Sequence, residues 1–390
     1  MGSDDRHSSG PASTLSAAPR DRAGGKITNR ALNRALLERQ LLTRRSDRTA
    51  LAAVEQLAGM QAQAPQAPYV GLWSRLQNFH PDHLGALMTG REVVRMAMMR
   101  STVHLITAAD ALSMRPLFQD FLARGLRATG WAPGVTDEDL AKVASVGREF
   151  LDERPRTNPQ IRAHLAEYWP DHDPTFLTLA VRNLLPCVQV PPRGLWGASG
   201  QPTLTTTQAW LGRPEDPEPS PEWLVHRYLA AYGPATVQDM QAWSGLTRLG
   251  EVFGRLRPSL RTYSAEDGRE LFDVPDGPLP DPDTPVPVRF LPEYDNCLRS
   301  HADRARVIPE DARAGLASKN DSPRPTFLVD GHVRGTWKLE RSRTRAALVL
   351  TPFRSLSKRH AAELTSEAER LLEFVAPTTG DRDVRLTTSD

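Results

Sequence analysis

The sequence has little cysteine and no long apolar run. Cys187 and Cys297 are the only cysteines among 390 residues, so a disulfide framework or a cysteine-rich zinc site is excluded. No apolar stretch approaches the roughly 18 residues of a membrane-spanning helix. The N-terminus also lacks the apolar core of a signal peptide. We therefore expect a reduced, cytoplasmic protein without a membrane span.

Common catalytic signatures are also missing. The ten histidines show no metal-binding spacing, and there is no glycine-rich phosphate loop ending in Lys-Ser/Thr and no GxSxG motif. The sequence thus predicts no metal and no nucleotide cofactor. Aromatic residues make up only 6% of the chain, and no base-stacking cage is evident.

The charge of the chain is balanced overall but unevenly distributed. The formal net charge is +2. Residues 86–130 carry six Arg against three acids, and residues 299–345 carry eleven Lys or Arg against six acids. Residues 264–283, in contrast, carry one Arg against seven acids. This segregation indicates a positive face turned toward an anion, or solvated helix faces that average out in the fold. Arg outnumbers Lys 44 to 5, a bias that a GC-rich genome explains as well as phosphate binding does.

The length of the chain suggests two or three domains. Residues 1–25 show no periodicity and are interpreted as a disordered tail or a cloning remnant. Two proline-rich acidic stretches, 212–222 and 275–287, are typical of linkers or long loops.

Residues 223–274 have the element order of a winged helix. The pattern predicts three helices and then a hairpin over residues 260–274, turning at Glu266-Asp267-Gly268. A similar order recurs earlier, where helices precede the predicted hairpins 93–107 and 187–197. We therefore expect three winged-helix units at residues 26–130, 131–211 and 223–274. The helices predicted in them cover residues 31–43, 48–60, 68–79, 81–88, 136–152, a stretch beginning at 158, 174–185, 223–232, a stretch beginning after 236, and 247–255.

Residues 285–390 change in character. Short strands are predicted at 286–291, 305–308, 326–330, 333–340 and 346–351. A terminal helix begins at Ser355, with one apolar face formed by Leu364, Ala368, Leu371, Leu372 and Val375. The section is interpreted as a β-barrel or small sheet, and the whole chain as a mainly α, α+β protein.

Winged helices favour nucleic acid as the partner. The acidic hairpin at 260–274 would repel phosphates, so the third unit is interpreted as scaffold. Arg91, Arg95 and Arg100 surround the first hairpin and suit a phosphate backbone. A narrow cationic turn carries His332 and Arg334 and is a candidate to enter a groove; the alternative is an ordinary exposed turn.

Gln61 and Gln63 follow a predicted helix and precede Pro65. Two residues one apart cannot share a helical face, because two steps rotate by about 200°. In extended backbone they point the same way, so the two amides are predicted to converge at a helix end. The alternative is a pair of solvent-exposed helix-terminal glutamines.

The sequence resembles the winged-helix-domain DNA glycosylases of the AlkZ type, and the resemblance runs from about Leu32 to Phe374. Met60-Gln61-Ala62-Gln63 matches the family's Gln-hydrophobic-Gln motif. Further matches are 68–76, 100–105, 193–197, 232–235, 243–245, 291–295 and 330–337. The resemblance implies three tandem winged helices around a concave DNA channel, a C-terminal β-barrel, and excision of alkylated bases, including bulky adducts and interstrand crosslinks. It also implies self-resistance to a genotoxic natural product.

The chemistry of the amides fits one class of lesion. A glutamine amide cannot act as a general base at neutral pH. A purine alkylated at N7 or N3 is already cationic and leaves readily, so the site only has to place a water and support an oxocarbenium-like sugar. Gln61 and Gln63 are therefore the predicted catalytic residues of a monofunctional, monomeric glycosylase acting on alkylated double-stranded DNA.

Other residues near these motifs have two interpretations. Arg100, Thr102 and His104 lie on one hairpin and are candidates to line the DNA channel, or His104 is a core histidine. Asp295 is expected to pair with an arginine in a structural role. The tryptophans at 73, 196, 243 and 337 are expected to pack rather than stack on bases.

Two rival functions remain at this point. A non-enzymatic winged-helix regulator would need a dimer and a basic recognition helix, but residues 247–255 are followed by an acidic wing. A protein that sequesters a genotoxic drug directly is the other alternative.

Overall fold

The computed structural model describes residues 23–128, 136–316 and 323–387. Most of the predicted N-terminal tail lies outside these residues. Its last residues do not, because β1 (Ala23–Ile27) pairs in parallel with β8 (Arg261–Ala265). The boundary predicted at residue 25 is therefore placed too late.

The chain begins with four helices that were expected from the sequence. Thr28 caps the first and Thr49 caps the second, each accepting a hydrogen bond from a backbone N–H of the first turn. The second helix therefore starts two residues after the predicted position 48. The four helices are α1 (Asn29–Arg39), α2 (Ala50–Gln56), α3 (Ala67–Arg75) and α4 (Pro81–Thr89).

A six-stranded sheet joins the first two sections of the chain. Its order is β2-β4-β3-β6-β7-β5. The hairpin of the first section, β3–β4, pairs with β6 of the second through Arg95 and Gln189, so the two sections share one sheet. The strands are β2 (Met60–Gln61), β3 (Val93–Ala97), β4 (Val103–Thr107), β5 (Arg156–Thr157), β6 (Cys187–Gln189) and β7 (Thr203–Thr206).

The hairpin predicted at 187–197 is wrong in its second strand. β6 pairs with β7, not with residues 194–197. The proline pair at 191–192 cannot donate ladder hydrogen bonds, and the following turn packs on α3 instead. There Tyr69 donates to the carbonyl of Gly194 at 2.9 Å and Gln66 donates to the carbonyl of Leu195 at 3.0 Å.

Helices surround the second section and build the third. The capping boxes at Thr136 and Thr236 start α7 and α12 as expected. Leu126 of α6 packs in the core of the second section. The helices are α5 (Ala108–Met114), α6 (Gln119–Arg127), α7 (Asp137–Glu153), α8 (Asn158–Tyr168), α9 (Pro174–Leu184), α10 (Thr207–Leu211), α11 (Pro221–Tyr232), α12 (Val237–Ser244) and α13 (Leu249–Leu256).

The predicted acidic hairpin is present as β8 and β9 (Glu270–Asp273), which pair antiparallel. Its acids are engaged within the protein. Glu266 accepts from the backbone N–H of Asn29 at 2.9 Å, and Glu270 pairs with Arg257 at 2.7 Å. This hairpin therefore ties the third section to the start of α1.

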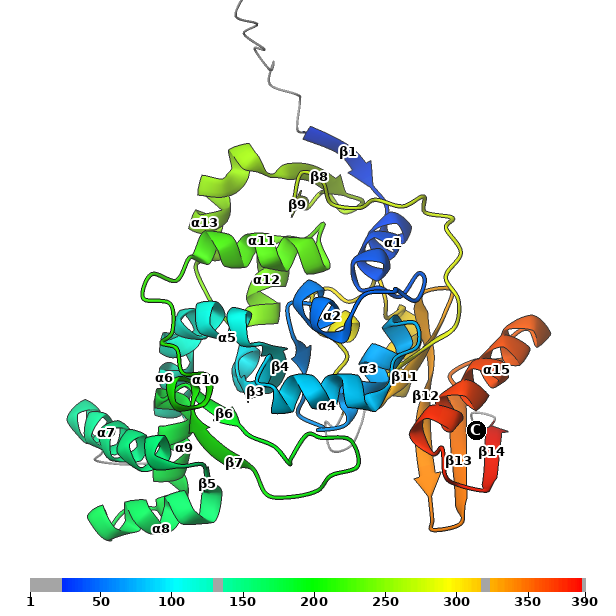
Figure 1. Cartoon of the computed structure of the whole chain (residues 1–390). Helices are drawn as coiled ribbons and strands as arrows, with labels where there is room; N and C mark the ends of the chain where they lie inside the picture. Colours follow the sequence, from blue (N-terminus) through cyan, green and yellow to red (C-terminus); the bar gives the residue numbers. More distant parts are fainter. Residues whose placement is uncertain (1–22, 129–135, 317–322, 388–390) are drawn as a thin grey trace, which may run out of the picture.

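The C-terminal section is an open sheet rather than a barrel. In the described residues the order is β10-β11-β12-β13-β14, and the two outer strands do not pair with each other. Helix α15 (Lys358–Val375) packs on it (Figure 1) through the five apolar residues predicted from the sequence. A helix that covers the apolar face removes the need for closure. The strands are β10 (Arg289–Leu291), β11 (Thr326–Val329), β12 (His332–Arg341), β13 (Arg345–Pro352) and β14 (Asp381–Leu386).

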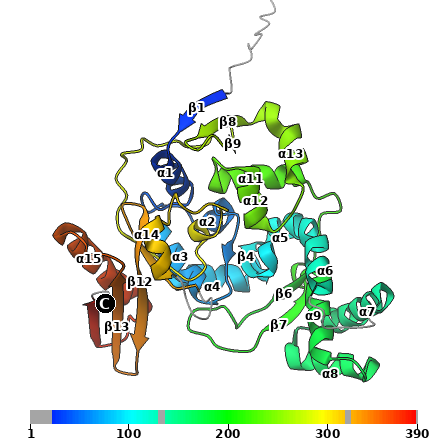
Figure 2. The ribbon, with the colours of Figure 1, turned by 180° about the vertical axis from the view of Figure 1, so that it is seen from behind.

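Two strand assignments in this section need correction. Residues 305–308 form a turn, in which the N–H groups of Val307 and Ile308 donate to the carbonyl of Arg304. The parallel edge strand β14 was not predicted, because its alternating charges hide the pattern of a strand. Figure 2 shows α14 (Glu310–Leu316), which follows that turn, on the face opposite the view of Figure 1.

Two large hydrophobic cores meet at the start of β2. Ala58 belongs to the core that joins α1, the β3–β4 hairpin and the third section. Met60 belongs to the core that joins α2, α3, the C-terminal sheet and α15. The short strand β2 is therefore fixed from both sides.

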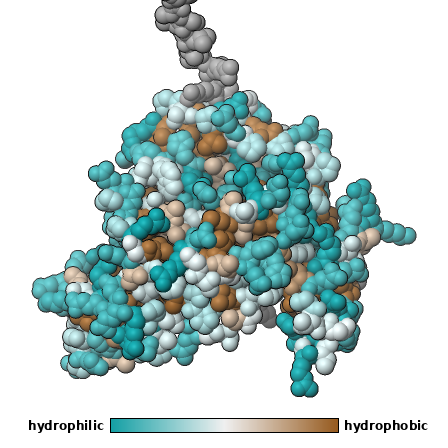
Figure 3. All heavy atoms as spheres, in the orientation of Figure 1, coloured by the Kyte–Doolittle hydropathy of each residue, from teal (hydrophilic) through white to brown (hydrophobic). Residues whose placement is uncertain are grey.

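The surface is mainly polar. Figure 3 shows hydrophobic residues gathered near the middle of one face and hydrophilic residues over the projecting parts. In the described part of the chain, no helix combines the length and apolar character that a membrane crossing requires.

Candidate functional site

The two glutamines lie on the strand β2 and in the bend after it, and their position is set by a sharp reversal after α2. Ala58 and Gly59 have φ of 51° and 85°, which turn the chain out of the helix. A Cβ at Gly59 would lie 3.1 Å from the carbonyl oxygen of Leu105. Glycine is therefore needed for β2 to approach β4 this closely.

Gln61 lies on extended backbone beside β4, as predicted, whereas Gln63 lies in the bend that follows β2. Gln61 pairs with His104 in the ladder, and the N–H of Ala62 donates to the carbonyl of Val103 at 2.7 Å. Both side chains nevertheless contact the β3–β4 hairpin, Gln61 through Arg100 at its turn and Gln63 through the N–H of Val103.

The two amides differ in exposure and in partners. Gln61 is only 4% exposed, and its Oε1 accepts from Nη2 of Arg100 at 2.9 Å. Its Nε2 is buried without a hydrogen-bond partner. Gln63 is exposed, and its Oε1 accepts from the N–H of Val103 at 3.3 Å. The alternative of two solvent-exposed glutamines thus fails for Gln61.

Arg100 lies at the turn of the β3–β4 hairpin with a φ of 54°. Its Nη1 donates to the carbonyl of Trp243, at the end of α12. In the described ranges no carboxylate is paired with Arg100, Gln61 or Gln63. Burial, together with the cations of Arg299 and Arg304, lowers the pKa of Arg100 to about 10.

Arg95 is not available to a phosphate, contrary to the sequence interpretation. It is 2% exposed, and its Nη2 donates to the carbonyl of Ala62, between the two glutamines, at 2.9 Å. Burial, then the cation of Arg193, lowers the pKa of Arg95 to about 10. Arg91 is exposed, but it donates to the carbonyl of Trp210 at 2.7 Å. Arg95 therefore holds the backbone between the two glutamines in place.

A brace from distant parts of the chain holds the reversal before β2. Nδ2 of Asn296 donates to the carbonyl of Gly59 at 2.7 Å, and the hydroxyl of Tyr232 donates to the carbonyl of Leu57 at 2.8 Å. Arg75 and Asp295 form a buried ion pair at 2.8 Å, which confirms the structural role expected for Asp295. The sequence assigned no role to Asn296 or Tyr232, although Tyr232 is the first residue of the motif at 232–235 and Asn296 directly follows the motif at 291–295.

Thr102 and His104 lie directly beside the glutamines. Oγ1 of Thr102 donates to the carbonyl of Met99 at 3.1 Å, and Nδ1 of His104 is 2.9 Å from the carbonyl of Thr102. His104 is 2% exposed. Burial and the cation of Arg100 lower its pKa to about 3, so the ring is neutral, as a core histidine would be.

The turn that carries His332 is not a free projection, which corrects the interpretation as a tip that enters a groove. Nδ2 of Asn33 donates to the carbonyl of Gly331 at 2.9 Å, and Asp330 pairs with Arg30 at 3.1 Å. His332 is half-buried, and burial lowers its pKa. Arg334 is partly exposed and lies 3.7 Å from a carboxylate oxygen of Asp311. The turn is thus docked on α1.

The tryptophans pack, as expected. Trp73, Trp243 and Trp337 are buried, and Trp196 packs partly buried against the same core as Trp73. Within the described residues no group of three or more His, Cys, Asp or Glu side chains is placed to hold a metal.

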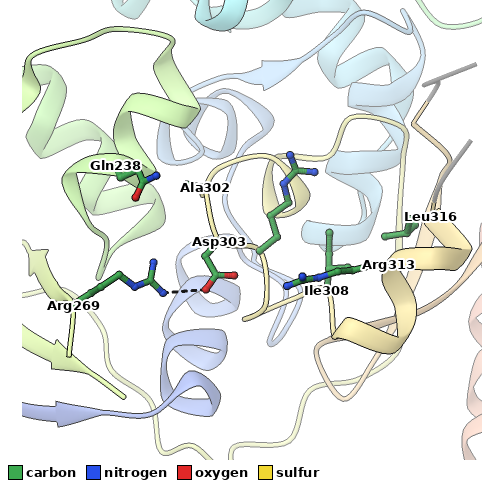
Figure 4. A pocket seen from close by; sticks show the side chains of 8 residues that line it. Gln238, Arg269, Ala302, Asp303, Ile308, Arg313 and Leu316 are labelled. Carbon is green, nitrogen blue, oxygen red and sulfur yellow. Dashed lines mark hydrogen bonds and ion pairs between the residues drawn. The ribbon is translucent and has the colours of Figure 1, made fainter. Parts of the chain in front are cut away.

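A cavity of about 660 Å³ opens between α12, the acidic hairpin and α14 (Figure 4). Its lining includes Arg304 and Arg313. Helix α12, which lines this cavity through Gln238, also carries the Trp243 carbonyl that accepts from Arg100.

The comparisons with known proteins agree on one family. A family model described as DNA glycosylase AlkZ-like matches residues 54–374. The chain is 26% identical over 357 residues to the interstrand DNA cross-link repair glycosylase of Streptomyces sahachiroi, covering 81% of this chain and 88% of that protein. The solved structure of the Streptomyces sahachiroi DNA glycosylase AlkZ aligns with a TM-score of 0.72 at 21% identity, over 93% of this chain and 100% of that one. This chain therefore belongs to the AlkZ-like DNA glycosylases, enzymes that act on DNA.

Proposed function

We propose that this glycosylase hydrolyses the N-glycosidic bond of cationic N7- or N3-alkylated purines in double-stranded DNA. The observation that carries the proposal is the pair of neutral amides at the end of β2 and in the bend after it, with no carboxylate paired to either in the described residues. A site of this kind has no strong base. It suits a substrate whose leaving group needs no protonation.

The two glutamines have complementary positions for this chemistry. Gln63 is exposed, and its amide can hold a water below C1′ of the lesion nucleotide. Gln61 is fixed by Arg100, and its carbonyl dipole contributes to the field in which the sugar cation forms. The amides act through position and dipole, and the damaged base supplies the driving force by leaving as a neutral molecule.

The DNA-binding arrangement is part of the proposal. The helices and hairpins of residues 26–130, 131–211 and 223–274 would act as three winged-helix units, with the third as scaffold, and residues 285–390 as a separate C-terminal unit. Arg100, Thr102, His332 and Arg334 are the proposed DNA contacts, whereas His104, also a candidate from the sequence, is only 2% exposed and lies in the core behind them. The engaged acids of the β8–β9 hairpin support the scaffold role.

Bulky lesions fit the same scheme. The similar Streptomyces sahachiroi protein is named an interstrand cross-link repair glycosylase, and we extend bulky adducts and crosslinks to this chain as proposed substrates. Self-resistance to a DNA-alkylating natural product would be the corresponding biological role. The protein would act as a monomer and without a cofactor.

The test is release of 7-methylguanine from methylated duplex DNA. Gln61→Ala and Gln63→Ala are each expected to slow the release by on the order of 10²-fold, the effect of removing one oriented dipole from a catalytic site. Gln208→Ala, at an exposed position on α10, is the matched control and should leave the rate unchanged. Equal rates in all four proteins would remove the two amides from the mechanism.

A further inference from the structure

Three arginines without carboxylate partners lie on segments that meet around Gln61. Arg100 donates to Gln61 at 2.9 Å. Arg299 follows Asn296, whose Nδ2 donates to the carbonyl of Gly59 at 2.7 Å, and Arg304 lines the cavity beside α12. Arg100, Arg299 and Arg304 form no ion pair with any acid of the described residues. Arg299 lies over the ring of Tyr294 at 5.9 Å, which fixes its direction. Its cation lowers the pKa of both Arg100 and Arg304, each of which is lowered first by burial. A cluster of like charges in a partly desolvated place is unfavourable unless an anion joins it.

Arg304 lines the cavity described above, together with Arg313. The carboxylate in this cavity, Asp303, is already engaged: it pairs with Arg269 at 3.0 Å (Figure 4) and accepts from the N–H of Ala305 at 2.9 Å. Asp303 is therefore not available to neutralise Arg304. The cavity of about 660 Å³ leaves room for an anionic group from outside the protein.

Two buried donors at the inner end of the cluster lack partners. Nε of Arg100 and Nε2 of Gln61 are both buried without a hydrogen bond, and Gln61 is 4% exposed. Buried donors are rarely left unpaired in a finished structure. Together with the unneutralised charge, they indicate a site that is completed by a ligand with acceptor oxygens.

We propose that Arg100, Arg299 and Arg304 bind a phosphodiester of the DNA strand that carries the lesion. Guanidinium groups recognise phosphate oxygens with charge-assisted hydrogen bonds. Because Arg100 also donates to Gln61, the phosphate contact sets the direction of the amide and so aligns the lesion with the site. The inference rests on the proposed function, since it names the part of the DNA that the same site holds.

The experiment combines protein variants with neutral phosphate replacements. Single methylphosphonate linkages are placed at successive positions around a 7-methylguanine, and both kcat/KM for base release and DNA affinity are measured with the wild type, Arg299→Gln and Arg304→Gln. At one position the neutral linkage should lower kcat/KM about tenfold in the wild type. In each variant that same linkage should have little further effect, since the contact is already lost.

The controls separate this inference from folding and from the proposed function. Arg359→Gln removes an equally charged side chain on α15, which is 83% exposed and paired with Glu363, and it should leave the methylphosphonate pattern unchanged. Thermal unfolding confirms that each variant is folded. The phosphate site would be overturned if, at every position, the neutral linkage lowered kcat/KM by the same factor in both variants as in the wild type. That result would leave the proposed function intact. If the wild type released no base, the proposed function would fail. The effect of the neutral linkage on DNA affinity, compared between the wild type and the variants, would still decide the phosphate site.

Discussion

Buried arginines occur in two settings in this protein. Arg75 and Arg39 each form a two-point ion pair, with Asp295 and Asp273. Arg95 and Arg100 lie around the glutamine strand and donate to carbonyl oxygens instead. Burial lowers the pKa of an arginine in both settings. Asp295 outweighs burial at Arg75, whose pKa is raised, but burial outweighs Asp273 at Arg39, whose pKa is lowered. The pKa values of Arg95 and Arg100, which have no carboxylate partner in the described residues, fall to about 10.

The arginines with a carboxylate partner hold the fold together, whereas those around the glutamines belong to the proposed site. Arg75 joins α3 to the segment after β10, and Arg39 joins α1 to β9. These pairs connect sections that are far apart in the sequence, and they are complete without a ligand. The arginines around Gln61 and Gln63 leave positive charge without a counter-ion in the described residues, at the place where a DNA phosphate would supply it.

The largest expected effect comes from breaking a complete pair. Asp295→Asn leaves Arg75 charged and without its partner at a site where both side chains are 2% exposed or less. We expect a loss of about 3–5 kcal/mol in the free energy of unfolding, measured by urea denaturation. Glu363→Gln, which removes the partner of exposed Arg359, should cost about 0.5 kcal/mol or less. Similar small losses in the free energy of unfolding for both variants would show that the buried pair is no more important to stability than the exposed one.

A smaller effect on stability is expected from His104, which lies beside Arg100, an arginine without a carboxylate partner in the described residues. Burial and Arg100 lower its pKa from 6.5 to about 3, so the unfolded chain binds a proton between these values that the folded chain does not. Stability is therefore lost as the pH falls through 6.5. From pH 7 to pH 5 the wild type should lose about 2 kcal/mol more than His104→Asn, as measured by urea denaturation at each pH. Parallel pH profiles would contradict a buried neutral ring.

The smallest effect on stability is expected at Arg304. Its exposed side chain has no ion pair within the described residues, so Arg304→Gln should change the free energy of unfolding by about 0.5 kcal/mol or less. The slope of log affinity for duplex DNA against log salt should nevertheless fall by about 0.9, the contribution of one phosphate contact. An unchanged slope would place Arg304 outside the DNA interface.

Local features were predictable from the sequence because they depend on neighbours. The capping boxes at Thr136 and Thr236, the apolar face of α15 and the hairpin β8–β9 follow from spacing and turn residues. The extended backbone at Gln61 also agreed with the prediction, whereas Gln63 lies in a bend after β2.

Contacts between distant segments were not predictable in this way. The docking of the turn at Gly331 on α1 depends on Asn33, and the brace at Gly59 depends on Asn296. The pairing of β6 with β7 rather than with 194–197 depends on the fit of that turn to α3. No spacing rule within one segment contains this information, because the partners are far apart along the chain.

The proposed hydrolysis depends on the positive charge of the damaged base. The most direct measurement compares base release from duplexes that carry 7-methylguanine or its neutral 7-deaza analogue with the same methyl group. We predict rapid release of 7-methylguanine and no enzyme-dependent release of the analogue, because two amides cannot protonate a poor leaving group. Release of both bases at similar rates would contradict the account and would require an acid that the site does not provide.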